Sequence, residues 1–227
     1  MRNNTSPKKR EIFIFLCIMV LFLSPNLISR ICSNGSGYGF CDPDCETESG
    51  CNNAIINYYI ELGAGYFLNS YSNTLVFLNR IELENFKGID YLELNQILND
   101  AVRNIKTAKE VYSLLIRTAE ITPYNKKIIF KLRTFDYSAF SKENGLNDVV
   151  FREVADFLKA GDIIGVYKWF HLNLNEIEAM LILMSNEVSS NRIPLSDNLW
   201  RVNEEYSRTL LFSQYVAMVF DAILQEV

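Results

Sequence analysis

Four cysteines lie close together near the N-terminus, in the stretch CSNGSGYGFCDPDCETESGC at positions 32–51. A thiol cluster of this kind either forms disulfides or binds a metal ion. Zinc sites more often use Cys-x-x-Cys pairs, whereas the gaps here hold eight, three and five residues. We therefore expect two disulfides, with a metal site and free thiols as the alternatives. The disulfide candidates are Cys32, Cys41, Cys45 and Cys51.

The same stretch alternates acidic residues at Asp42, Asp44 and Glu46, which suggests calcium. An EF-hand loop also requires a central glycine and a terminal bidentate glutamate, and neither follows at the required distance. We therefore expect no metal in this segment.

The N-terminus indicates an oxidising compartment. Lys8, Lys9 and Arg10 precede the apolar run IFIFLCIMVLFL at positions 12–23, a pattern typical of a secretory signal peptide. The run is shorter than the roughly 20 apolar residues of a membrane span. We expect residues 1–29 to be a signal peptide, with an uncleaved anchor as the alternative. Cleavage would also remove Cys17 and leave the even set of four cysteines that disulfides require.

The charge of the chain argues against nucleic acid as a partner. The full chain has a net charge of −5, and removal of residues 1–29 would take away four basic residues and one acidic residue, leaving −8. Phosphate backbones are bound by clustered lysine and arginine, and no basic stripe is evident.

The one histidine, His171, offers little for catalysis. Di-iron bundles need Glu-x-x-His on two helices, and the residue three before His171 is Lys168. The Cys-x-x-Cys-His motif of covalent haem and the Gly-x-Ser-x-Gly motif of hydrolases are both absent. We expect a structural or surface histidine, no cofactor and no enzymatic activity.

The stretch NYYIELGAGYFLNSY at positions 57–71 is rich in aromatic residues. On a helix these rings spread over more than one face, so that some should remain partly exposed, where tyrosine offers a rigid apolar surface with a polar tip. We treat them as candidate partner-binding residues, with ordinary core packing as the alternative: Tyr58, Tyr59, Tyr66 and Tyr71. Gly63 and Gly65 predict a shallow groove for a neighbouring helix or ring, or else a ligand cleft.

Apolar residues beyond position 52 recur at helical spacing, in steps of three and four. We expect long helices over residues 52–84, 91–122, 163–188 and 197–227 and a short helix over 148–160. Asp90 should cap the second helix, and Gly161 and Asn191 should terminate others. Residues 125–135 could form a short helix or a strand, and DYSAFSKENGLN reads as a loop. In the last helix we expect a buried stripe, with Leu210, Ala217 and Leu224 beside it, that runs through Leu199, Val202, Tyr206, Thr209, Ser213, Val216, Phe220 and Ile223.

Long amphipathic helices bury their apolar faces against one another. The predicted fold is all-α: a four-helix-bundle-like domain at 52–227 with one or two short extra helices, preceded by the Cys/Gly-rich segment 30–51. The expected function is an exported, non-catalytic partner-binding or scaffold protein in the periplasm or outside the cell, with an unidentified protein partner. The membrane would be contacted only through a retained N-terminal segment. The alternative is a sensor-like bundle that binds a small ligand between helices.

Overall fold

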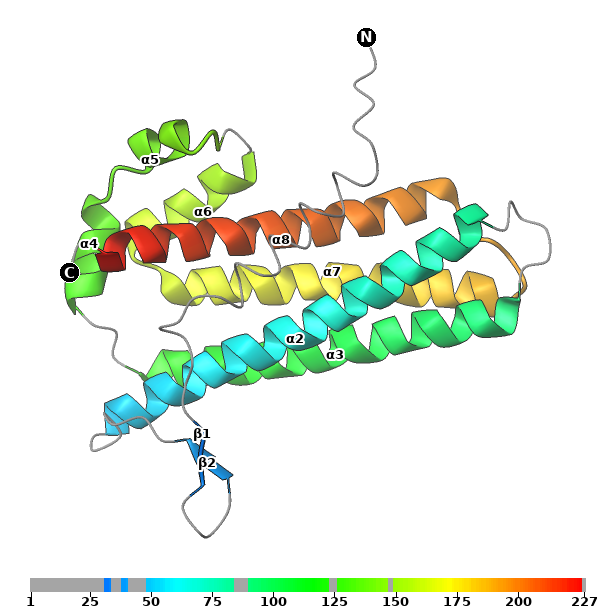
Figure 1. The fold of residues 1–227 in the computed structure, drawn as a ribbon, viewed down its shortest axis with the longest axis horizontal. Helices are drawn as coiled ribbons and strands as arrows, with labels where there is room; N and C mark the ends of the chain where they lie inside the picture. Colours follow the sequence, from blue (N-terminus) through cyan, green and yellow to red (C-terminus); the bar gives the residue numbers. More distant parts are fainter. Residues whose placement is uncertain are drawn as a thin grey trace.

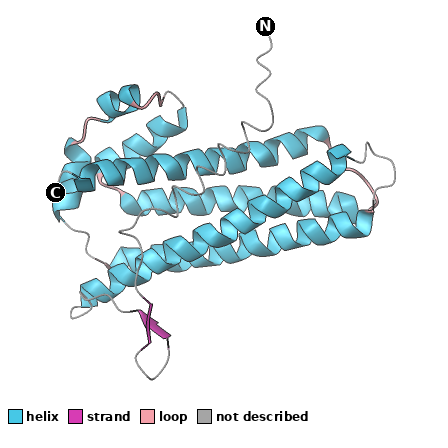
Figure 2. Ribbon diagram, in the orientation of Figure 1, coloured by secondary structure: helices cyan, strands magenta, loops and turns pink. Residues whose placement is uncertain are grey.

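A computed structural model describes residues 31–33, 38–40, 48–83, 90–122, 126–146 and 149–225 of the chain. The described region is dominated by helices, which confirms the predicted all-α fold class (Figure 2). Two strands, β1 (Ile31–Ser33) and β2 (Tyr38–Phe40), pair as an antiparallel hairpin with Cys32 opposite Gly39.

Four long helices lie side by side as a bundle: α2 (Glu48–Leu83), α3 (Tyr91–Ile121), α7 (Ile163–Ser189) and α8 (Ser196–Gln225) (Figure 1). Three short helices, α4 (Lys126–Thr134), α5 (Tyr137–Glu143) and α6 (Val149–Ala160), form the long connection from α3 to α7. The prediction allows for one or two short helices, and the residues described between α3 and α7 form three. Helix α2 also begins four residues before the predicted start at position 52.

The predicted loop over residues 136–147 is wrong, because α5 occupies most of it. Asp136 acts as the N-cap, and its carboxylate accepts hydrogen bonds from the backbone N–H groups of Ser138 and Ala139 at 3.1 and 2.9 Å. The side chain of Tyr137 is 2% exposed, and its hydroxyl donates to the carbonyl oxygen of Leu132 at 2.8 Å. A cap and one buried ring therefore fix a helix that is too short to show apolar periodicity.

The structure confirms the predicted N-cap of α3 and the predicted terminating residues of α6 and α7. Asp90 caps α3 by accepting from the N–H groups of Leu92 and Glu93. Gly161 follows α6 at φ +71°, and Asn191 follows α7 at φ +54°, both in the left-handed region that closes a helix.

Cations of α4 contact the ends of two other helices. Lys131 and Arg133 donate to the carbonyls of Ile223 and Ala160, in the last turns of α8 and α6. These cations therefore stabilise two helix C-termini.

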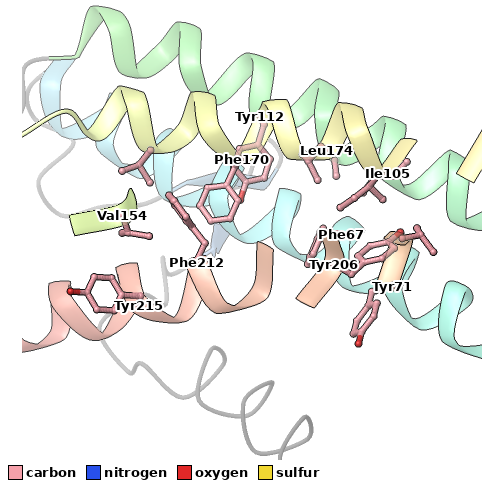
Figure 3. Packing of buried hydrophobic residues seen from close by; sticks show 14 of the residues in the cluster. Phe67, Tyr71, Ile105, Tyr112, Val154, Phe170, Leu174, Tyr206, Phe212 and Tyr215 are labelled. Atoms are coloured by element: carbon pink, nitrogen blue, oxygen red, sulfur yellow. The ribbon is translucent and has the colours of Figure 1, made fainter. Parts of the chain in front are cut away.

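The core is rich in aromatic rings: Tyr206, Tyr215 and Phe212 are fully buried (Figure 3), and so is Phe77. Phe212 of α8 stacks on Trp169 of α7, with ring centroids 3.7 Å apart and planes at 9°. The predicted α8 stripe is correct at Val202, Tyr206, Thr209 and Ile223 and wrong between Thr209 and Ile223. Phe212, Tyr215 and Val219 are fully buried there, whereas Ser213, Val216 and Phe220 are only half-buried.

A buried hydroxyl network joins α2 to α3 and α8. Ser70 donates to the carbonyl oxygen of Ala101 at 2.7 Å and lies 2.6 Å from the hydroxyl of Tyr206. Because the serine has a single proton, the second bond runs from the Tyr206 O–H to Ser70 Oγ. Burial raises the pKa of Tyr206 to about 12, so this hydroxyl stays protonated and can donate at any physiological pH. The network satisfies its buried hydroxyls and fixes the alignment of three helices.

No helix among the described residues is both long enough and apolar enough to span a membrane. The predicted signal peptide, residues 1–29, lies outside the described part of the chain. The predicted disulfides also remain predictions, because the side chains of Cys32, Cys41, Cys45 and Cys51 are not among those described.

Candidate partner-binding surface

The four candidate tyrosines divide between the surface and the core of the protein. Tyr58, Tyr59 and Tyr66 are half-buried on α2, and the rings of Tyr58 and Tyr59 lie 5.8 Å apart. Tyr71 is only 6% exposed and packs against Tyr206 at a centroid distance of 4.9 Å. Tyr71 is therefore a core residue in this fold, whereas the other three tyrosines are partly exposed on α2.

A shallow surface concavity lies along α2. Its lining residues follow one another at alternating intervals of three and one, which places them on a single face of the helix: Tyr58, Glu61, Leu62, Gly65, Tyr66 and Asn69. We call this set the α2 outer face. It combines two tyrosines and one leucine with a carboxylate and an amide, a mixture found in protein interfaces. Partial burial raises the pKa of the Glu61 carboxyl above its usual range.

The two glycines of this segment have different surroundings. A Cβ atom built on Gly63 would lie 2.7 Å from Cε2 of Tyr112 and 3.5 Å from Cγ1 of Val111. The ring of Tyr112 is 7% exposed and packs against Phe170, so it cannot easily move away. The predicted close approach of an aromatic ring is thus confirmed at Gly63.

Gly65 lies two residues further along and faces outward. A Cβ atom built there would have no heavy atom of the described residues within 4 Å. A glycine inside a helix destabilises it by about 1 kcal/mol relative to alanine. At Gly65, unlike Gly63, packing among the described residues does not compensate for this cost. A bare backbone at the centre of the α2 outer face would allow another backbone to approach closely.

The surroundings of His171 show a hydrogen-bonded link between helices rather than an activated nucleophile. Ser113 donates to the carbonyl oxygen of Lys109 at 3.0 Å, so its Oγ must accept from Nε2 of His171, also at 3.0 Å. The amide of Asn175 lies 3.4 Å from Nδ1 and can donate to it. A general base would need a free lone pair on Nε2, and in this arrangement Nε2 carries the proton. Burial and the neighbouring Lys109 lower the pKa of His171, which favours the neutral imidazole.

Other polar pairs continue along the same α3–α7 contact. Lys109 pairs with Glu178, and Lys106 lies 3.9 Å from the same carboxylate. One heptad further along α7, Ser185 lies 3.0 Å from Oδ1 of both Asn95 and Asn99. Such pairs at heptad spacing set the alignment of two helices. We interpret His171 as one member of this series.

A charged and aromatic cluster that the sequence did not predict joins α6, α7 and α8. Glu153 accepts from Arg208 at 2.9 Å and from the indole N–H of Trp169 at 3.3 Å. The Arg208 guanidinium also lies 5.4 Å from the centroid of the Trp169 ring, a cation–π distance. Each of the three side chains therefore has an interaction partner within the cluster, and the cluster links α6 to α7 and α8.

A metal site among the described residues would need several ligating side chains close together. The residues that the structure describes contain no group of three or more His, Cys, Asp or Glu side chains that could hold a metal ion. The acidic residues of the segment 41–47 lie outside them.

Comparison with known proteins gives no match to this chain, whether with protein-family models, with curated proteins or with solved structures. Its function is therefore inferred from its own residues.

Proposed function

We propose that this protein is an exported, non-catalytic binding module whose α2 outer face binds an α-helix of a protein partner. The observation that carries the proposal is Gly65: an outward-facing glycine at the centre of a tyrosine-lined concavity, with no described neighbour to account for it. Close helix–helix approach requires small residues at the crossing point, and the flanking tyrosines would supply contact area on both sides.

A binding role agrees with the remaining observations better than a ligand-binding sensor does. The space between the helices around Tyr206 is filled by Phe67 and Tyr71, whose ring centroids lie 5.4 and 4.9 Å from it (Figure 3). The hydroxyls of Ser70 and Tyr206 already have hydrogen-bond partners, so they offer no free polar group to a small ligand at this point. No contact among the described residues of this interior favours a small ligand between the helices.

Binding is tested by truncating one ring of the α2 outer face. Tyr66→Ala should weaken capture of the partner by at least ~10-fold, because central tyrosines are frequent interface hot spots. Leu172→Ala is the matched control, since Leu172 is 62% exposed on another helix, α7, and is not part of this face. The partner is first identified by mass spectrometry from the native source, and its affinity for each purified variant is then measured. Equal affinities for the two variants, with unchanged helicity, would contradict the proposal.

Export is proposed from the N-terminal sequence and from the four cysteines. The mature chain would begin near Arg30 and carry two disulfides. Intact-mass measurement of the native protein, without reducing agent, should show a chain that lacks residues 1–29 and is four hydrogen atoms lighter than its reduced form. A native chain that retains residues 2–28 in the cytoplasm, or that has four alkylatable thiols, would refute this part.

A further inference from the structure

Helix α4 carries a concentration of positive charge within this acidic chain. Its nine residues KKIIFKLRT hold four cations and no acid, in a chain whose net charge is −5. Lys131 and Arg133 bind the carbonyls of Ile223 and Ala160. Lys126 and Lys127 are exposed in the first turn of the helix.

An exposed aromatic ring lies among these cationic side chains of α4. Phe130 is 67% exposed, although the other apolar residues of α4 are wholly or partly buried. Lys126 and Lys127 precede it by four and three residues, and Arg133 follows it by three. On a helix these spacings place all three cations beside the ring, on the outward face. We call Lys126, Lys127, Phe130 and Arg133 the α4 basic patch.

We propose that the α4 basic patch docks the protein onto an anionic phospholipid surface. The cations would contact lipid phosphates while the ring enters the boundary between headgroups and acyl chains, the arrangement of interfacial helices. The ring of Phe130 projects from the helix surface, with 67% of its area exposed. A protein partner would have to supply a matching pocket, whereas a lipid interface deforms around an exposed ring.

This contact is independent of the α2 outer face and differs from a membrane anchor in the N-terminal segment. Three cations and one ring give weak, reversible binding rather than insertion. Binding should therefore weaken as salt screens the cations, over a distance of about 10 Å at 0.1 M ionic strength. A bundle held at a membrane surface in this way would keep its other faces available to a protein partner.

The test is sedimentation of the full chain with vesicles of phosphatidylcholine alone or of phosphatidylcholine mixed with phosphatidylglycerol. The wild-type chain should bind the anionic vesicles at least ~10-fold more strongly than the neutral ones. Each membrane-adjacent cation contributes about five-fold to partitioning, so Lys126→Glu with Lys127→Glu should lower binding by more than ~25-fold. Phe130→Ala should lower binding to both vesicle types. The apolar run at positions 12–23 is identical in every variant, so differences between variants report on the patch.

Two matched controls distinguish the effect of the patch substitutions from the effects of a changed net charge and of lost apolar surface elsewhere. Arg103→Glu with Arg117→Glu reverses two exposed cations on α3, and Leu183→Ala removes an apolar side chain that is 57% exposed on α7. Both should bind anionic vesicles nearly as well as the wild-type chain. Equal losses in the control and patch variants would overturn the proposal, as would equal wild-type binding to the two vesicle types. Binding of poly-glutamate without binding of vesicles would also overturn it, and would assign the patch to an acidic protein instead.

Discussion

Phe212→Ala is expected to lower the free energy of unfolding by about 3–5 kcal/mol, the upper range for truncation of a buried side chain. The ring is fully buried, stacks on Trp169 and meets Phe170 edge-on at a centroid distance of 5.0 Å. Its removal would leave a cavity lined by aromatic side chains, and aromatic rings cannot rearrange to fill such a space. Chemical denaturation monitored by circular dichroism measures the effect.

Ser213→Ala is the matched control for Phe212→Ala. Ser213 is the next residue on α8, and its spacing in the sequence predicts a buried position, but the structure leaves it half-buried. Its substitution should change stability by less than about 0.5 kcal/mol. A larger loss for Ser213→Ala than for Phe212→Ala would show that α8 is rotated by one residue from the orientation in Figure 3.

Gly63→Ala and Gly65→Ala are expected to shift stability in opposite directions. Alanine at position 65 should raise the free energy of unfolding by about 0.5–1 kcal/mol, because it improves helix propensity and its Cβ meets no described atom. Alanine at position 63 gains the same propensity but places its Cβ against the buried ring of Tyr112. Overpacking of this kind costs about 1–3 kcal/mol, so we expect a net loss.

The midpoints of urea denaturation compare the two glycine variants directly. Tyr112→Leu should relieve part of the loss in the Gly63→Ala background and have no such effect in the Gly65→Ala background. If both substitutions destabilised the protein to the same extent, Gly65 would also have a packing partner within the chain. The proposal that Gly65 serves the approach of a partner helix would then lose its basis.

Helix α3 is predictable from sequence because every local signal agrees. Asp90 is a good N-cap, and the apolar residues from Leu94 to Ala119 recur with one phase over the whole helix. All eight residues of this stripe are buried: Leu94, Leu98, Ala101, Ile105, Ala108, Tyr112, Leu115 and Ala119. When the capping residue and the hydrophobic periodicity predict the same helix, the local sequence and the tertiary packing favour the same structure.

Helix α8 is predicted less well because its sequence is apolar on several faces. After Thr209 both Phe212 and Ser213 continue an acceptable helical spacing, and so do Tyr215 and Val216. Spacing alone cannot choose between them. The larger aromatic rings are the ones buried in the structure, since they bury more apolar area and fit beside the rings of α6 and α7. Side-chain volume is the better guide here.

Part of the candidate site can be predicted from the spacing of residues in the sequence, and part depends on contacts between residues on different helices. The sequence shows two glycines among tyrosines, but only the position of Tyr112 on the neighbouring helix distinguishes Gly63 from Gly65. Likewise, the environment of His171 depends on Ser113, which is 58 residues away in the chain. Contacts of this kind follow from the alignment of helices, which hydrophobic periodicity does not specify.

The central claim, that the α2 outer face binds a partner helix across Gly65, is tested most directly by the affinity of Gly65→Ala for the identified partner. Isothermal titration calorimetry should show at least ~10-fold weaker binding for this variant, because the added methyl group would hold the two backbones apart. The same variant should be more stable than the wild-type chain, so the lost affinity could not be ascribed to unfolding. Unchanged affinity in a Gly65→Ala protein of equal or greater stability would contradict the account.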